Sequence, residues 1–195
     1  MPPPSQRSVP LSGHKLKGTT IRSTVQAIEK VHGAAGRMAV EERLPESLRG
    51  LLQDAIVPVG WYPVELSAQM HVAVRDLFGR GSWTASRVLG REAAKIDFGG
   101  VYRVLLRAVP HATLWERVGL AWTQYNSGGI SRWEVAGPGL VVGHVTEVAG
   151  YNEGMWEAAA GRLETMLERS GVRARSVSLY DCTPHSVRGE VLWIE

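Results

Sequence analysis

Apolar residues recur every three or four positions along most of residues 21–125. This period is that of a helix with one buried face. A helix is expected over 21–32, where Gly33 is placed to end it, and a weaker helical signal covers 102–106. Further helices are expected directly after Pro45, Pro63, Ser82 and Pro110.

The pattern changes after Asn126 to the alternation of half-buried strands. Strands are expected over 130–135 and 140–148, joined at Gly137-Pro138-Gly139, and over 172–180 and 186–194. Between the two pairs, residues 152–170 predict a long helix that Gly171 ends. The pattern predicts an α+β fold: an N-terminal helical half packed on a C-terminal antiparallel sheet of about four strands, which one long helix crosses.

The first residues are rich in proline and poor in large apolar groups. Residues 1–16 are therefore expected to form a disordered tail. The remainder, 17–195, shows no internal repeat and is short enough for a single domain.

Charge argues against nucleic acid as a partner. The chain holds 22 Lys and Arg against 19 Asp and Glu, a net charge of +3. Arg7, Lys15 and Lys17 supply that excess, since residues 1–17 contain no acid. The rest is balanced, and acids interrupt the arginines throughout, whereas nucleic-acid binders concentrate basic residues on one face.

The composition of the chain also predicts where in the cell the protein lies. No apolar run reaches the roughly 20 residues that span a bilayer, and no apolar segment follows Met1 as in a secretory signal. A lone cysteine, Cys182, has no partner in the chain for a disulfide, which fits a reducing cytoplasm. We therefore expect a cytoplasmic protein with no membrane span.

Catalytic and metal-binding constellations are sparse. Cys182 and His185 form a single Cys-x-x-His, whereas zinc sites usually combine two such pairs, so no metal is predicted. A thiol nucleophile with His185 as its base is the weaker alternative, a Cys-dependent enzyme. No other catalytic residue and no cofactor is predicted.

Aromatic residues are the more informative set. Seven Trp occur against two Phe. Trp and Tyr combine an apolar body with a polar tip, which suits pocket walls and interfaces. Together with two histidines that adjoin apolar helical positions, they give the candidate pocket residues Trp61, Tyr62, His71, His111, Trp122 and Tyr125.

An ordered set of landmarks resembles a paralogous family of unknown function described from myxobacteria. The landmarks are Lys17-Gly18-Thr19-Thr20, Val31-His32-Gly33, Leu44-Pro45, Trp61-Tyr62-Pro63-Val64, the segment 89–94, Trp122-Thr123-Gln124-Tyr125, Tyr151 with Gly154, Gly171-Val172, Cys182 and Trp193. That family is similar to the ligand-binding domains of nitric-oxide signalling and Golgi transport, which include four-vinyl-reductase, Bet3-type and haem nitric-oxide-binding domains.

The resemblance implies helices packed on an antiparallel sheet and a role in binding. Haem sensors of the group hold the haem through an axial histidine and a Tyr-x-Ser-x-Arg element. Here Tyr125 and Ser127 are followed by Gly129 in place of the arginine, and four-vinyl-reductase domains often carry a second cysteine that this chain lacks.

Two functional hypotheses follow beside the enzyme alternative. The leading one is a non-enzymatic binding or signalling module that acts through protein–protein interaction. It is expected to form a homodimer through the outer face of the sheet or a helix pair. The other is a sensor whose pocket, between the helical half and the sheet, takes a small apolar ligand or haem.

Overall fold

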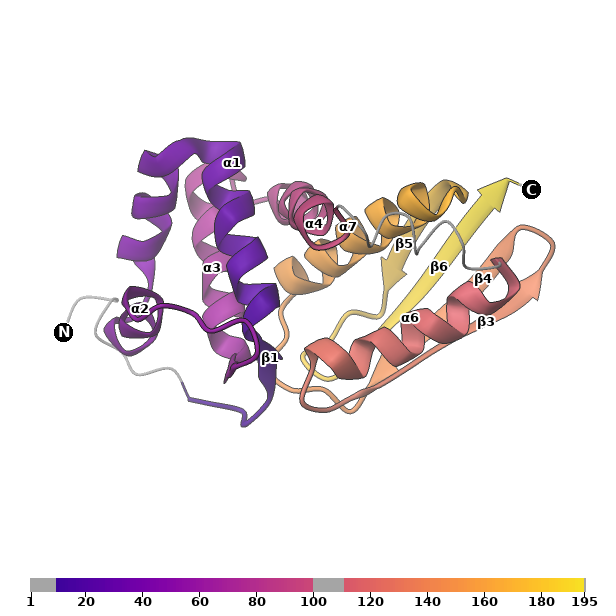
Figure 1. Ribbon diagram of the computed structural model, residues 1–195, viewed down its shortest axis with the longest axis horizontal. Coiled ribbons are helices and arrows are strands. Elements are labelled where there is room, and N and C mark those ends of the chain that lie inside the picture. The colour runs from indigo at the N-terminus through magenta and orange to yellow at the C-terminus, as the bar shows by residue number, and fades with distance from the viewer. Residues whose placement is uncertain (1–9, 100–110, 195) are drawn as a thin grey trace.

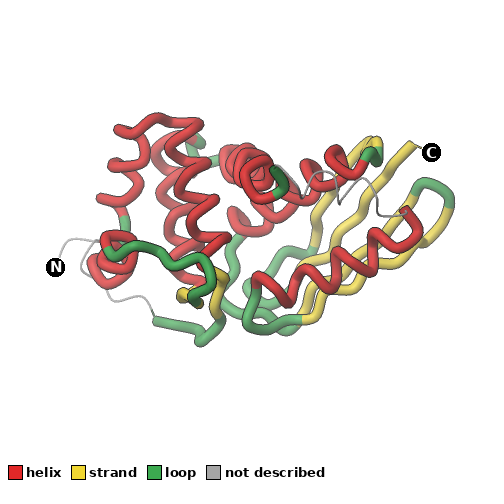
Figure 2. Tube along the Cα trace, viewed as in Figure 1, coloured by secondary structure: helices red, strands yellow, loops and turns green. Residues whose placement is uncertain are grey.

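The structure, a computed structural model, describes residues 10–99 and 111–194, with the side chains of His111 and Ala112 left out. The described helices of the N-terminal half are α1 (Gly18–Arg43), α2 (Glu46–Gln53), α3 (Val64–Phe78) and α4 (Thr84–Asp97). They gather toward one end of an elongated molecule, and the four-stranded sheet lies toward the other end (Figures 1 and 2). The expected α+β architecture is confirmed.

Helix α1 is longer than its pattern predicts. Gly33 has φ 74° and ψ 174°, which bends the helix at the position where the sequence predicts its end. Beyond Gly33 the chain resumes a helical course as far as Arg43. The weak helical signal at 102–106 lies outside the described residues.

The C-terminal half contains the main sheet. Its strands are β3 (Ile130–Gly137), β4 (Leu140–Thr146), β5 (Arg173–Tyr180) and β6 (Val187–Ile194), antiparallel in the order β3-β4-β6-β5. Helix α7 (Glu153–Ser170) packs against β5, and α6 (His111–Tyr125) packs against β3. Two described helices therefore cover the sheet, where the sequence predicts one.

Capping residues at both ends of helix α7 explain why the sequence predicts its bounds. The Asn152 side chain accepts a hydrogen bond from the Met155 N–H at 2.9 Å, which satisfies a free donor of the first turn. Gly171 ends the helix in the left-handed region at φ 89°. Along its length α7 packs against α4, which in turn packs on α1 and α3.

Part of the expected tail is packed. Residues Lys15–Lys17 form β1, which pairs with β2 (Trp61–Pro63). His14 and Leu16 are buried, and the Ser12 N–H donates to Glu65 Oε1 at 2.6 Å. The packed chain therefore begins before Lys17, because the short strands find their partners in distant residues that local composition does not reveal.

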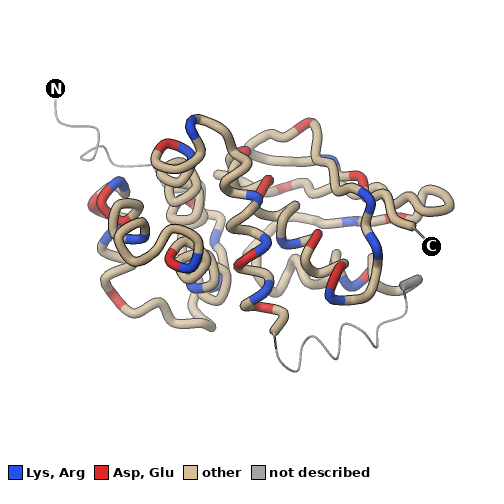
Figure 3. Tube along the Cα trace, turned by 90° about the horizontal axis from the view of Figure 1, so that it is seen from above, with Lys and Arg blue, Asp and Glu red and all other residues tan. Residues whose placement is uncertain are grey.

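The core falls into two apolar clusters. The first joins the helical half to the start of α7 and to Val145 and Val187 of the sheet, and the second lies between α6, α7 and the sheet. Basic and acidic residues are interspersed along the described helices (Figure 3). None of the described helices is both long and apolar enough to cross a membrane.

Candidate ligand-binding cavity

A cavity of about 210 Å³ lies where the helical half meets the sheet. Its walls come from α6 and α7, from one face of all four strands of the main sheet, and from residues of α1, α3 and α4 that face them. Most of the wall is apolar: Val145, Val187, Leu163, Met155 and Met166 are typical. Such a space, deep between two layers, is where small molecules bind in proteins.

Trp133 forms the floor of the cavity on the sheet. A Cβ atom built on Gly143 would lie 2.3 Å from the Trp133 ring, and one on Gly189 would lie 2.9 Å from it. Because these neighbouring strand positions carry no side chain, the indole can lie flat across β4 and β6. Its Nε1–H donates to Ser131 Oγ at 3.0 Å, and Trp115 stacks at 6.2 Å between ring centroids.

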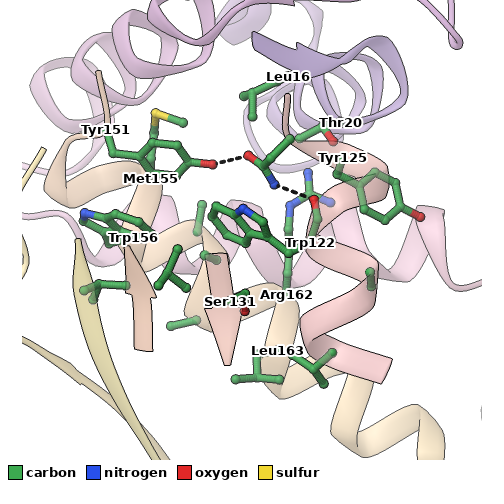
Figure 4. Close-up of a pocket in the computed structure, with 18 of the residues that line it drawn as sticks. Leu16, Thr20, Trp122, Tyr125, Ser131, Tyr151, Met155, Trp156, Arg162 and Leu163 are labelled. Carbon is green, nitrogen blue, oxygen red and sulfur yellow. Dashed lines mark hydrogen bonds between the residues drawn. The ribbon is translucent and has the colours of Figure 1, made fainter. Parts of the chain in front are cut away.

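Trp122, Tyr151 and Trp156 form an aromatic wall (Figure 4). Tyr151 stacks on Trp156 with 4.3 Å between centroids, and Trp122 lies 5.9 Å from Tyr151. Each polar tip has a partner: Tyr151 Oη donates to Asn126 Oδ1 at 2.6 Å, and the two indole N–H groups donate to the carbonyls of Gly128 and Thr183. Burial raises the pKa of Tyr151, so its hydroxyl stays protonated. The wall is therefore uncharged, and its polar tips are satisfied by hydrogen bonds.

Arg162 of α7 lies at the end of the cavity next to the helical half. Its guanidinium forms an ion pair with Asp97 of α4, and Nη2 donates to Ser23 Oγ at 3.1 Å and Thr24 Oγ1 at 3.2 Å, both on α1. The carboxylate also accepts from Ser23 Oγ at 3.1 Å. Asp97, Thr24 and Arg162 line the cavity, so its polar end holds a pair of opposite charges that neutralise each other.

His71 of α3 is the one described histidine that lines the cavity. Its Nδ1 lies 3.0 Å from Ser86 Oγ of α4, and the side chain is buried. Burial and the nearby positive charge of Arg162 lower the pKa of His71 to about 3. The imidazole is therefore neutral at physiological pH.

The six candidate pocket residues divide between three places. His71, Trp122 and Tyr125 line the cavity. Trp61 is 40% exposed beside Lys17, and the Tyr62 hydroxyl accepts from the Val57 N–H at 2.8 Å, so both belong to β2 and lie outside the described lining. The side chain of His111 lies outside the described residues.

The structure does not bring Cys182 and His185 into a reactive pair. The Cys182 side chain is exposed, yet partial desolvation of its sulfur and the carboxylates of Glu153, Glu157 and Asp181 raise its pKa. An activated nucleophile requires the opposite shift. His185 Nδ1 lies 3.0 Å from the Val148 carbonyl oxygen. Within residues 10–99 and 111–194, no three His, Cys, Asp or Glu side chains gather as a metal site would require.

The sequence matches no family model and no curated protein. Solved structures of H-NOX proteins, however, share the fold. The Fe(II) unliganded H-NOX protein from K. algicida superposes with a TM-score of 0.67 at 11% identity, over 92% of this chain and 97% of that one. A Cs H-NOX variant that carries 4-cyano-L-phenylalanine gives a TM-score of 0.66 at 14% identity, over 92% and 97%. A structure that probes haem distortion in the H-NOX family gives 0.61 at 15%, over 92% and 95%.

The chain therefore has the H-NOX fold, which raises the question of haem. Haem needs an axial donor, room for a large flat ring and partners for two carboxylates. His71 has donor chemistry, but the cavity of about 210 Å³ is below the roughly 300–1,000 Å³ typical for drug-sized ligands. Arg162 is the one cation in the described lining, and Asp97 already neutralises it. The described residues thus do not fit haem.

The most informative wall residues were outside the candidate set. Tyr151, Trp133 and Trp156 carry the same aromatic signal in the sequence as Trp122, but only the packing of α7 on the sheet shows which rings meet. Arg162 and Asp97 are 65 residues apart, and no local pattern links them. The glycines of β4 and β6 were the signal available for Trp133, since strand glycines mark close approach of another group.

Proposed function

We propose that this chain is a small-molecule sensor domain whose cavity holds one apolar molecule. The observation that carries the proposal is the cavity itself, about 210 Å³ of mostly apolar space between the two layers of the fold. The likeness to H-NOX structures supports the same conclusion at the level of the fold.

Size and chemistry favour a compact ligand. A dry engineered cavity of roughly 150 Å³ is enough to bind benzene. The present cavity is larger, and Trp122, Trp133 and Trp156 offer ring faces to an aromatic or branched molecule. Apolar burial then supplies roughly 25 cal/mol for each Å² removed from water.

Binding on the inside also gives a physical route to signalling. Arg162 touches both the cavity and helices α1 and α4, so a ligand that presses on this end changes contacts between the two halves. Self-association and a protein partner stay predictions. They fit a sensor that passes its state to another chain, and light scattering over a range of concentrations tests the homodimer.

The proposal is tested by native mass spectrometry of the protein purified from its own host. Val118 of α6 lines the cavity, whereas Leu120 of the same helix is 68% exposed and lies outside the described lining. Val118→Trp fills the cavity, and Leu120→Trp adds the same side chain to the surface as a matched control.

We expect the wild type and Leu120→Trp to carry a mass above that of the 21.3 kDa chain, lost on denaturation, and Val118→Trp to lack it. A bare chain in all three proteins contradicts the proposal. So does a bound molecule that Val118→Trp retains, because that molecule lies elsewhere.

A further inference from the structure

The charged side chains that line the cavity determine which ligand charge it can accept. Asp97 and Arg162 are the charged side chains among the described residues that line it, and they form an ion pair. Both are largely buried, with side-chain exposures of 17% and 22%. Ser23 donates to Asp97 and accepts from Arg162, so the pair is also supported by hydrogen bonds.

The remaining polar groups of the wall are neutral. Tyr151 and Asn126 bond each other, Ser131 accepts from Trp133, and His71 stays neutral because burial and Arg162 oppose a second positive charge. An anion that enters this space therefore meets no free cation in the described lining. It also lies close to the Asp97 carboxylate, and an unpaired buried charge is strongly unfavourable.

We propose that the ligand is electrically neutral, an apolar ring or branched chain with at most uncharged polar groups, and that the Asp97–Arg162 pair excludes carboxylic acids of the same shape. The inference rests on the proposed function, since it concerns the same cavity. It names Asp97 as the residue that determines specificity: without its carboxylate, Arg162 becomes a free cation that attracts an acid.

The test compares two probes of one shape by titration calorimetry at pH 7. 2-Naphthol is neutral at that pH, and 2-naphthoate is an anion with the same double ring. Three proteins are titrated: the wild type, Asp97→Asn, and Asp76→Asn as a control. Asp76 also pairs with an arginine, Arg75, but at the surface and away from the cavity.

We expect the wild type and Asp76→Asn to bind 2-naphthol at least about tenfold more tightly than 2-naphthoate, and Asp97→Asn to shift that ratio by at least about tenfold toward the acid. The wild-type ratio alone decides the inference if Asp97→Asn does not fold. Two results overturn the inference that the Asp97–Arg162 pair excludes acids: equal or tighter binding of 2-naphthoate by the wild type, or an unchanged ratio of the two affinities in folded Asp97→Asn. Neither result contradicts the proposed function. Failure of both probes to bind the wild type counts against the proposed function.

Discussion

Two glycines give the cavity floor its shape at the residue scale. Gly143 and Gly189 pair across β4 and β6, and the Trp133 indole lies over both. Any side chain at Gly143 occupies space that the ring now fills, so this position controls whether Trp133 faces the cavity with its flat side. The Trp133 ring in turn stacks on Trp115, which belongs to the apolar cluster between α6, α7 and the sheet. A shift of Trp133 therefore also disturbs the packing of that cluster.

Gly143→Ala is therefore expected to destabilise the protein by about 1–3 kcal/mol, because the new methyl group overlaps the indole. Gly137→Ala is the matched control: it lies in β3, and an added Cβ there meets nothing within 4 Å. Urea unfolding followed by circular dichroism measures both. Equal stability of the two variants would show that Trp133 does not depend on the glycine.

His71 gives the stability of the fold a pH dependence. Its pKa falls from 6.5 to about 3 on folding, so below pH 6.5 the unfolded chain takes up a proton that the native protein does not. Stability is thus lost as the pH falls from 6.5 toward 3. At 1.36 kcal/mol per pKa unit, the loss from pH 7 to pH 5 is about 2 kcal/mol.

His71→Gln removes this contribution, and we expect its unfolding free energy to fall correspondingly less between pH 7 and pH 5. Burial also lowers the pKa values of His14 and His32, so a smaller loss of the same sign remains. His144→Gln, on the exposed side of β4, is measured alongside as the matched histidine-to-glutamine substitution outside the core. A slope that His71→Gln leaves unchanged would contradict a buried neutral imidazole.

At the scale of elements, the close packing of α4 on α7 positions the cavity. A Cβ on Gly90 would lie 2.1 Å from the Ala158 carbonyl oxygen, and one on Gly161 would lie 2.2 Å from that of Arg87. The two helices thus meet backbone to backbone. Arg87 then reaches Glu157 and Glu164 across the contact, which fixes the helices in register.

Gly161→Ala is expected to cost stability at the upper end of the roughly 1–3 kcal/mol range for overpacking, because backbone atoms, not a flexible side chain, are in the way. Gly50→Ala, within α2 and with open space around its Cβ, is expected to stabilise by up to about 1 kcal/mol. Thermal unfolding of the pair measures the difference. Similar effects of both substitutions would mean that α4 and α7 have room to separate.

Elements set by local chemistry were predictable from the sequence, and those set by distant partners were not. Asn152 and Gly171 cap α7 through their own neighbours, so the pattern located that helix. The strands β1 and β2 are three residues each and exist because Lys15 pairs with Pro63, which no window of sequence reveals. The sequence likewise predicted Trp122 as a cavity residue, because its residue type is itself the signal. It did not predict the Arg162–Asp97 pair, because the two residues are distant in the chain.

At the scale of the whole molecule, Arg162 joins the two halves. It extends from α7, beside the sheet, to α4 and α1 of the helical half. The chain has the H-NOX fold, yet its described cavity of about 210 Å³ is below the roughly 300–1,000 Å³ typical for drug-sized ligands and holds no free cation in the described lining. This contrast supports the view that the fold serves a neutral apolar ligand here.

Arg162→Met leaves Asp97 without its cation, and we expect a loss of roughly 2–4 kcal/mol in unfolding free energy. The double variant Arg162→Met with Asp97→Asn is expected to regain a large part of that loss, because no uncompensated charge remains. A double-mutant cycle from urea unfolding measures the coupling. Additive effects would show that the pair does not act as a unit.

The most direct test of the account is a crystal structure of the protein as isolated from its own cells. We expect density for one small molecule between Trp122, Trp133 and Trp156, with no anionic group beside Asp97 and Arg162. Haem in the cavity, or a ligand bound elsewhere on the protein while the cavity holds none, would contradict the proposal that the cavity binds a neutral apolar ligand.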